Sequence, residues 1–311
     1  MADSSDDKVN RIFLWVNPRN LSTVFTKCVS FMDGACIWHE PYASSFFKEM
    51  FLDPEMIRKY PQLSIFKTQI AETSDQLESF DHYFDGGNLK PLSEFDYDWT
   101  QEQLSKPLPS GKKFLFVKDG AICIINRLEK LPKVPFKHTF LIRDPLRSAE
   151  SNRRLFMSFW RYDGKPEDFD MYHQNPYLDL DLLPPNPSYE VWRYVKANID
   201  PNPVVIDADD LQTFPEQILR KYCEAVNIPF KESYVNWEES DKSLKYYNGC
   251  IDQMVLGKKI HAFDAAFAST CFKPITSPKP RFDDLTPDGQ RFVLENQDGY
   301  KEMYDSRIKP E

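Results

Sequence analysis

Residues 17–23 form a polar stretch between an apolar segment and an amphipathic one, which is a position where proteins can bind anions. The apolar residues 12–16 favour a β-strand, and residues 21–31 have the spacing of a helix. The first N–H groups of such a helix and the side chains of the preceding loop point toward one site, where they stabilise a phosphate or sulfate. The residues expected at this site are Pro18, Arg19, Asn20, Leu21, Ser22 and Thr23.

A second candidate anion site follows the apolar residues 139–142. Arg143 stands directly after this expected strand, Pro145 suits the first turn of a helix, and Ser151 lies about two turns further on. A guanidinium group at a strand end can bind a phosphate dianion through two parallel hydrogen bonds. The alternative is a surface pair of Arg143 and Asp144, with Ser151 on a solvated helix face.

Apolar and amphipathic segments alternate along the chain, which predicts an α/β fold with a central, mostly parallel sheet flanked by helices. In such a sheet, ligands bind beyond the carboxyl ends of the strands, and both anion-binding segments follow strands. Further strands are expected at residues 36–38, 113–117, 139–142 and 204–206, and helices at residues 21–31, 121–131, 146–156, 214–226 and 287–304.

The 311 residues are predicted to form a single domain over residues 9–305, with flexible termini at residues 1–8 and 306–311. Two aromatic-rich inserts, at residues 42–110 and 156–193, interrupt the alternating pattern. These inserts either cover the sheet edge as a wall for a substrate or use their aromatic side chains for ordinary packing.

Composition excludes several classes of partner. A net charge of −9 argues against nucleic acid, and the chain has no apolar run long enough for stable membrane insertion. The six cysteines are scattered without a Cys-x-x-Cys pair, as is typical of reduced thiols in a cytoplasmic protein. We therefore expect a cytoplasmic location and no metal; a homodimer is left open.

The first anion loop differs from the loop of nucleotide triphosphatases, because it lacks the Gly-x-x-x-x-Gly-Lys-Ser/Thr pattern. Its Pro-Arg-x-x-Ser-Thr sequence instead resembles the sulfotransferases, which hold the 5′-phosphate of 3′-phosphoadenosine 5′-phosphosulfate (PAPS) at this turn. Their second motif is an Arg, a polar residue and a Pro, with a Ser eight positions after the Arg. Arg143, Asp144, Pro145 and Ser151 match it, so the resemblance implies that Arg143 and Ser151 bind the 3′-phosphate.

The resemblance covers residues 11–41, 113–154 and 204–237 and, more weakly, the C-terminal helix. It implies a P-loop NTPase-like architecture in a divergent member of the family. Ala208 stands where many animal members carry a Tyr near the adenine, and Gly120 stands where they carry a catalytic His. The glycine-rich phosphate loop near the C-terminus is not evident. Candidate replacements are Ser269, Thr270, Lys273, Lys279 and Arg281.

The resemblance also implies catalytic roles. Arg19 is expected to contact the 5′-phosphate and the transferred sulfonate, and Lys118 to stabilise charge in the transition state with Asp119 orienting it. Glu40 is the favoured base, with His39 as the close alternative, because relatives that use a carboxylate place Glu-Pro after the second strand. Burial beside Trp38 predicts a raised pKa for Glu40. Without a catalytic role, Glu40 would cap a helix and His39 would be a core residue.

The sequence thus predicts a sulfotransferase that moves a sulfonate from PAPS to a hydroxyl of a small, apolar acceptor such as a steroid, alcohol or phenol. Transfer would be an in-line displacement assisted by a carboxylate or His base. Two alternatives are a non-catalytic nucleotide-binding carrier or sensor and a P-loop kinase-like phosphotransferase.

Overall fold

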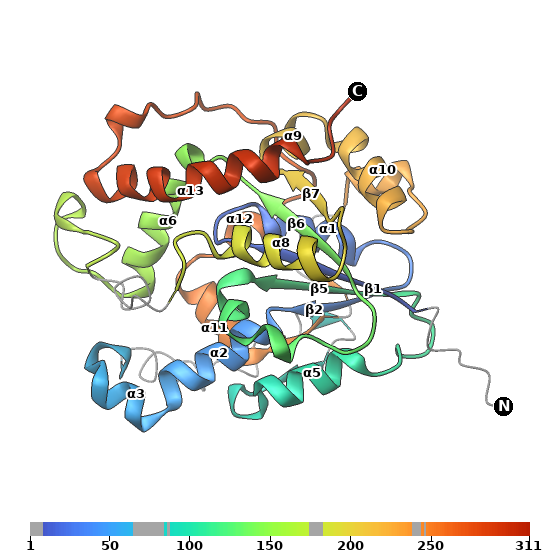
Figure 1. Ribbon diagram of the computed structural model, residues 1–311, viewed down its shortest axis with the longest axis horizontal. Helices are drawn as coiled ribbons and strands as arrows, with labels where there is room; N and C mark the ends of the chain where they lie inside the picture. Colours follow the sequence, from blue (N-terminus) through green and yellow to red (C-terminus); the bar gives the residue numbers. More distant parts are fainter. Residues whose placement is uncertain (1–8, 65–83, 86–87, 174–182, 238–243, 246) are drawn as a thin grey trace.

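Seven short, parallel strands make the central sheet of the protein, shown in the computed structural model of Figure 1. The structure describes residues 9–64, 84–85, 88–173, 183–237, 244–245 and 247–311; the first eight residues, expected to be flexible, lie outside this range. The sheet has the order β4-β9-β2-β5-β1-β6-β7, which confirms the predicted fold class. Its strands are β1 (Asn10–Val16), β2 (Ala35–His39), β4 (Asn88–Lys90), β5 (Phe114–Gly120), β6 (Lys137–Ile142), β7 (Val204–Asp207) and β9 (Tyr247–Cys250). Two further strands, β3 (Phe84–Asp85) and β8 (Leu244–Lys245), pair separately.

Proline begins most of the larger helices, because its fixed φ suits the first turn and its missing N–H is not needed there. The helices are α1 (Ser22–Ser30), α2 (Pro41–Leu52), α3 (Pro54–Lys59), α5 (Tyr97–Ser105), α6 (Pro145–Phe159), α8 (Pro187–Asn198), α9 (Ala208–Thr213), α10 (Pro215–Ala225), α11 (Ile251–Lys259), α12 (Asp264–Phe267) and α13 (Pro287–Asp305). None of the helices in the described ranges is both long and apolar enough to cross a membrane.

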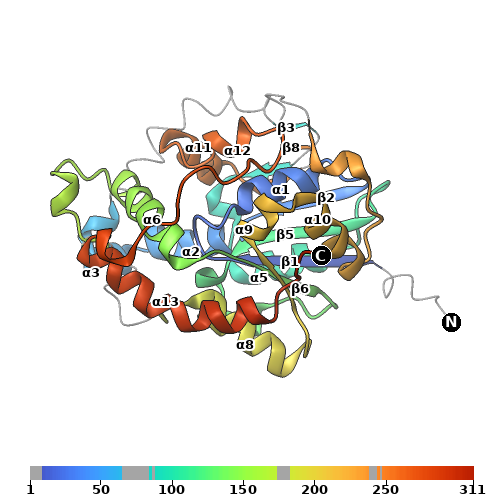
Figure 2. The same cartoon turned by 90° about the horizontal axis from the view of Figure 1, so that it is seen from above.

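The central strand β1 is buried on both faces, which explains its continuous apolar sequence. Ile12 and Leu14 face a core layer formed with α1 and α10. Phe13 and Trp15 face the opposite layer, formed with α2, α5 and α8. Figure 2 shows these two helix layers on either side of the sheet.

The prediction of a helix at residues 121–131 is wrong. The chain instead forms two short 3₁₀ helices, η6 (Ala121–Cys123) and η7 (Ile125–Lys130). Side chains of α5 bind the carbonyl groups of this segment: the Tyr97 hydroxyl donates to Cys123 over 2.7 Å, and the Gln101 amide donates to Leu131 over 2.7 Å. Three β-branched isoleucines in the segment also disfavour a helix.

The connections of the sheet diverge where both candidate anion-binding segments begin. β1 connects through α1 to β2 on one side of β1, whereas β6 connects to β7 on the other side. Connections that diverge in this way leave a space outside the carboxyl ends of the two neighbouring strands. After α13 the chain returns to the sheet, where Ile308 donates a backbone hydrogen bond of 2.9 Å to Val205.

Candidate functional site

The loop after β1 holds its backbone in a left-handed conformation at two positions. Arg19 and Leu21 both have a φ of 66°, where residues that carry a Cβ rarely lie. The amide of Asn20 fixes the loop, because it donates a hydrogen bond of 3.1 Å to the carbonyl of Leu141 in β6. Leu21 is the N-cap of α1, and none of the described side chains caps this helix. The first N–H groups of α1 are therefore available to an anion.

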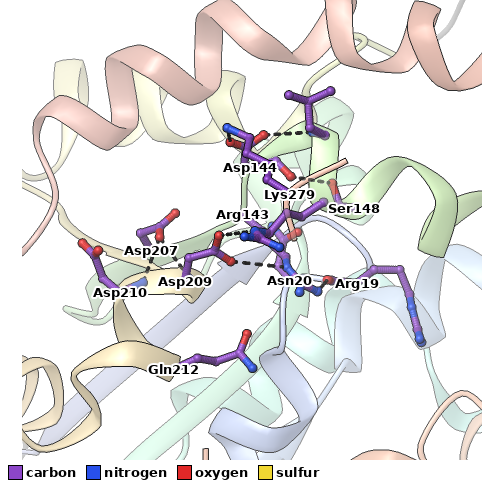
Figure 3. Close-up of polar contacts among 12 residues, drawn as sticks. Arg19, Asn20, Arg143, Asp144, Ser148, Asp207, Asp209, Asp210, Gln212 and Lys279 are labelled. Carbon is purple, nitrogen blue, oxygen red and sulfur yellow. Dashed lines mark hydrogen bonds and ion pairs between the residues drawn. The ribbon is translucent and has the colours of Figure 1, made fainter. Parts of the chain in front are cut away.

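Arg143 brings a second positive charge to this loop. Its Nη1 donates to the carbonyl of Arg19 over 3.1 Å, so the two segments predicted to bind anions are in contact. The Nε of Arg143 lies 3.9 Å from the Asp209 carboxylate, as Figure 3 shows, and the Nε of Arg147 lies 2.6 Å from the same carboxylate. Asp209 thus neutralises part of a cationic group that could bind a phosphate dianion.

Ser151 contacts the side chain of Arg19. Its Oγ accepts a hydrogen bond of 2.8 Å from Arg19 Nε, and Arg19 Nη1 lies 3.5 Å from the carbonyl of Ala262. Burial, and then the charges of Arg154 and Arg143, lower the pKa of Arg19. The side chain of Arg19 points away from Asp209 in Figure 3. The structure therefore gathers Arg19, Arg143 and Ser151 around one loop, with Arg143 turned toward Asp209 and Ser151 toward Arg19.

Glu40 and Lys118 form an ion pair at the carboxyl ends of β2 and β5. The parallel register aligns His39 with Lys118, which brings the next residue, Glu40, within reach of the ammonium group. Lys118 Nζ contacts Glu40 Oε1, and Gln253 in α11 donates from its Nε2 to Glu40 Oε2 over 2.7 Å. The side chains of Lys118 and Glu40 are 5% and 18% exposed, so this charged group is largely sheltered from water.

The pKa of Glu40 is lowered from its ordinary value. Burial is the largest single effect and raises the pKa, but the ammonium group of Lys118, through its charge and its hydrogen bond, and the nearby His39 together lower it by more. The expectation of a raised pKa is therefore wrong, because it considered the apolar neighbour Trp38 and not the cation from β5. Glu40 is a carboxylate at neutral pH, which is the form that can accept a proton.

His39 lies behind Glu40 and is almost completely buried. Its Nδ1 lies 2.8 Å from the hydroxyl of Tyr247, and its Nε2 lies 3.8 Å from Glu40 Oε2. Burial lowers the pKa of His39 to about 3, so the ring is neutral. Of the two candidate bases, Glu40 lines the cavity described below and His39 does not.

Asp119 caps a helix, whereas the resemblance implied that it orients Lys118. Its carboxylate accepts hydrogen bonds from the backbone N–H groups of Tyr42 (2.6 Å), Ala43 (3.1 Å) and Gly120 (2.8 Å). Successive residues of a strand point to opposite faces, which places Asp119 toward the first turn of α2. Asp119 therefore fixes the start of the helix that follows Glu40.

A cavity of about 230 Å³ extends from the Glu40–Lys118 pair and from the anion loop. Pro18, Arg19, Ser22 and Thr23 of the loop line it, and apolar side chains form most of the remaining wall. Its phenyl rings come from both aromatic-rich inserts and from the chain after α11, and they belong to Phe46, Phe47, Phe156, Phe159 and Phe263. The cavity combines an apolar wall with a charged end, so a largely apolar molecule with one polar group fits it.

Gly257 leaves room for the ring of Phe263 in the cavity wall. Phe263 packs against it so closely that a Cβ at Gly257 would lie 2.0 Å from the ring. A larger residue at position 257 would push the ring of Phe263 out of its present place in the cavity wall.

The C-terminal candidates for the missing phosphate loop are divided between two places. Lys279 pairs with Asp144 beside Arg143, as Figure 3 shows, and therefore lies near the second anion-binding segment. Ser269 is buried, and its carbonyl accepts a hydrogen bond of 2.8 Å from Lys27. We assign Ser269 to the packing of the chain against α1.

The sequence did not identify Asp209, Arg147 or Gln253 as residues of the site. Asp209 is the second residue after β7, so its place at the carboxyl edge was a usable signal. Gln253 follows β9, whose four residues include Asn and Gly and do not predict a strand. No cluster of three or more potential metal ligands occurs among the described residues.

Comparison with known proteins gives distant matches. No protein-family model matches the sequence. Among curated proteins, the chain is 27% identical over 233 residues to branched-chain-amino-acid aminotransferase-like protein 2 of Arabidopsis thaliana. The match covers 73% of this chain and 32% of that protein, so the chain spans about a third of the length of this curated relative.

Three similar solved structures are sulfotransferases, the family that the sequence motifs resemble. The sulfotransferase domain from the curacin biosynthetic pathway is 15% identical with a TM-score of 0.42, and the match covers 93% of this chain and 98% of that one. The sulfotransferase domain from the Synechococcus PCC 7002 olefin synthase is 14% identical with a TM-score of 0.44 (96% and 95% covered). Sulfotransferase STF9 from Mycobacterium avium is 12% identical with a TM-score of 0.45 (98% and 79% covered). This likeness concerns the fold.

Proposed function

We propose that this chain transfers a sulfonate group from PAPS to the hydroxyl of a small, apolar acceptor such as a steroid, alcohol or phenol. One observation carries the proposal: the anion loop with Arg19 and the Glu40–Lys118 pair line the same cavity, and Arg143 contacts the loop from the next strand. Sulfonate transfer needs these parts together, because an anionic donor must meet an acceptor hydroxyl beside a proton acceptor.

The donor is expected to bind across the two anion-binding segments. The N-terminus of α1, with Arg19, Asn20, Ser22 and Thr23, would hold the 5′-phosphate and the sulfonate. Arg143 and Ser151 would hold the 3′-phosphate, for which Arg143 must exchange Asp209 for the phosphate. The existing contact between Arg143 and the loop carbonyl of Arg19 would link the two phosphate positions.

The acceptor would lie against the phenyl rings with its hydroxyl at Glu40. In the transfer step, the acceptor oxygen forms a bond to sulfur while the bond from sulfur to the 5′-phosphate oxygen breaks. The hydroxyl proton passes to the carboxylate of Glu40, and the positive charges of Lys118 and Arg19 stabilise the leaving phosphate oxygen. Atoms and charge balance without a further reactant.

Binding and turnover together test this proposal. Isothermal titration calorimetry should show much tighter binding of 3′-phosphoadenosine 5′-phosphate than of adenosine 5′-phosphate, because only the former would engage both segments. A preference for Mg-ATP would contradict the proposal and favour a kinase-like phosphotransferase. Transfer of a radiolabelled sulfonate from PAPS to a panel of phenols, steroids and alkanols then separates an enzyme from a carrier, which would bind the nucleotide without turnover.

We further propose a cytoplasmic location. All six cysteines are present as free thiols, which suits a reducing compartment. Fractionation of cells that express the tagged protein would test the location. Light scattering of the purified chain would decide between a monomer and a homodimer.

A further inference from the structure

Gln253 is a buried polar residue that contacts the expected base but has no role in the reaction proposed above. It lies in α11 and is 6% exposed. Its Nε2 donates to Glu40 Oε2 over 2.7 Å, and its Oε1 accepts from Ser44 Oγ over 2.9 Å. The carboxylate accepts hydrogen bonds and cannot donate them, so the amide nitrogen is the atom that must face Glu40.

The two carboxylate oxygens of Glu40 have different partners. Oε1 contacts Lys118, whose ammonium group sits on a flexible stem and carries the charge expected to serve the leaving oxygen. Oε2 contacts Gln253, which is held at its other end by Ser44. Movement of Lys118 toward the donor would therefore leave Gln253 as the partner that keeps the carboxylate in place.

From these contacts we propose that Gln253 is a positioning residue, which holds the Glu40 carboxylate at the cavity wall in the orientation that accepts the hydroxyl proton. Its role in catalysis rests on the proposed function, whereas its role in orienting Glu40 can be measured without turnover. The helix that carries Gln253 also supplies Leu256 and Gly257 to the cavity wall. One rigid element thus places the proton acceptor relative to the surface that binds the acceptor molecule.

Several titratable groups surround Glu40, and they influence its pKa together with Gln253. They come from β2, β5, β9 and η6, and they are His39, Lys118, Asp119, Tyr247 and Cys123. Among the described side chains, Lys118 and Gln253 are the two that donate hydrogen bonds to the Glu40 carboxylate. Loss of the Gln253 amide removes one of two donors that favour the charged form, so the pKa of Glu40 should rise.

The variant Gln253→Met tests this role, because methionine has a similar length and no hydrogen-bond donor. Carbon-13 NMR of labelled glutamate carboxyl groups, with the Glu40 signal assigned from Glu40→Gln, should show Glu40 titrating at higher pH in the variant. In steady-state assays kcat should fall about tenfold or more, and its acidic limb should move to higher pH, with the KM of the acceptor little changed. Affinity for 3′-phosphoadenosine 5′-phosphate should stay constant.

Gln101→Met in α5 is the matched control. Its amide also donates a partly buried hydrogen bond, to the carbonyl of Leu131, but Gln101 does not line the cavity. This control should leave the Glu40 titration and the pH profile unchanged. If Gln253→Met fails to fold, Gln253→Asn withdraws the amide by one methylene and is expected to raise the pKa of Glu40 in the same way.

The outcomes separate the two proposals. An unchanged Glu40 titration in a folded variant at position 253 overturns the positioning role. A shifted titration in a protein that transfers no sulfonate in its wild-type form supports the positioning role and contradicts the proposed function. A shifted titration with an unchanged pH profile of kcat shows that Glu40 is not the base, and it overturns the catalytic part of the inference.

Discussion

Replacement of Arg143 by alanine gives a direct test of whether the two proposed anion-binding segments act together on the donor. The substitution removes the guanidinium group that lies 3.9 Å from Asp209 and donates to the loop carbonyl of Arg19. We expect weaker binding of 3′-phosphoadenosine 5′-phosphate, because its 3′-phosphate loses a charged hydrogen-bond partner. Binding of adenosine 5′-phosphate, which has no 3′-phosphate, should change much less.

The magnitude follows from the environment of Arg143. A hydrogen bond to a charged group contributes about 1.5–3 kcal/mol, which corresponds to roughly 10- to 150-fold in affinity. The side chain is 22% exposed, and binding must first break its interaction with Asp209. Both features reduce the binding free energy that Arg143 contributes. We therefore expect the alanine variant to bind roughly 10- to 50-fold more weakly, in the lower part of that range.

Calorimetry with the purified variants measures this effect. Arg220→Ala is the control, because Arg220 is 52% exposed, pairs with Glu216 on the surface of α10 and should leave the affinity unchanged. Asp209→Asn should act in the opposite direction and tighten binding severalfold, since it removes the carboxylate that competes with the phosphate. Equal affinities of Arg143→Ala and Arg220→Ala for the bisphosphate would refute the assignment of Arg143.

Three further predictions concern the base and the stability of the fold. Glu40→Gln should lower kcat by about 10²-fold or more without weakening nucleotide binding; full activity would exclude Glu40 as the base. Asp288→Ala should lower the free energy of unfolding by about 3–5 kcal/mol in urea titrations, because it leaves the 4%-exposed Arg153 without its carboxylate partner; an unchanged midpoint would contradict this. Burial lowers the pKa of His138 from 6.5 to about 4, so the unfolded chain binds a proton in this range that the folded chain does not. Stability should therefore fall from pH 6.5 to pH 4, by about 3 kcal/mol for this group, and His138→Asn should flatten that part of the curve; equal slopes for both proteins would refute it.

The loop after β1 and the main strands were predictable because their signals are local. Residues 12–16 are apolar without interruption because β1 is buried on both faces. The loop that follows is short enough for its polar residues to be assigned to one place, and the structure puts Arg19, Ser22 and Thr23 on the cavity wall.

The features that the sequence did not predict correctly depend on contacts between distant segments. Residues 121–131 have the spacing of a helix, but Tyr97 and Gln101 bind their carbonyl groups from a segment more than twenty residues away. The pKa of Glu40 depends on Lys118, which is adjacent only through the register of β2 and β5. Gln253 reaches the site because β9 joins the sheet beside β2, and a strand of four residues gives too weak a pattern to predict that pairing.

The left-handed residues at the carboxyl edge of the sheet imply a conflict between stability and activity. Arg161, Asn227 and His261 also have positive φ angles, but each follows the end of a helix, where this conformation is common. Arg19, Leu21 and Glu40 instead precede helices, and each carries a conformational cost of roughly 1–2 kcal/mol. Glycine at position 21 would relieve part of this cost while it loosens the loop. On the proposed function, substitutions that relieve this cost should therefore stabilise the fold and weaken the donor site at the same time.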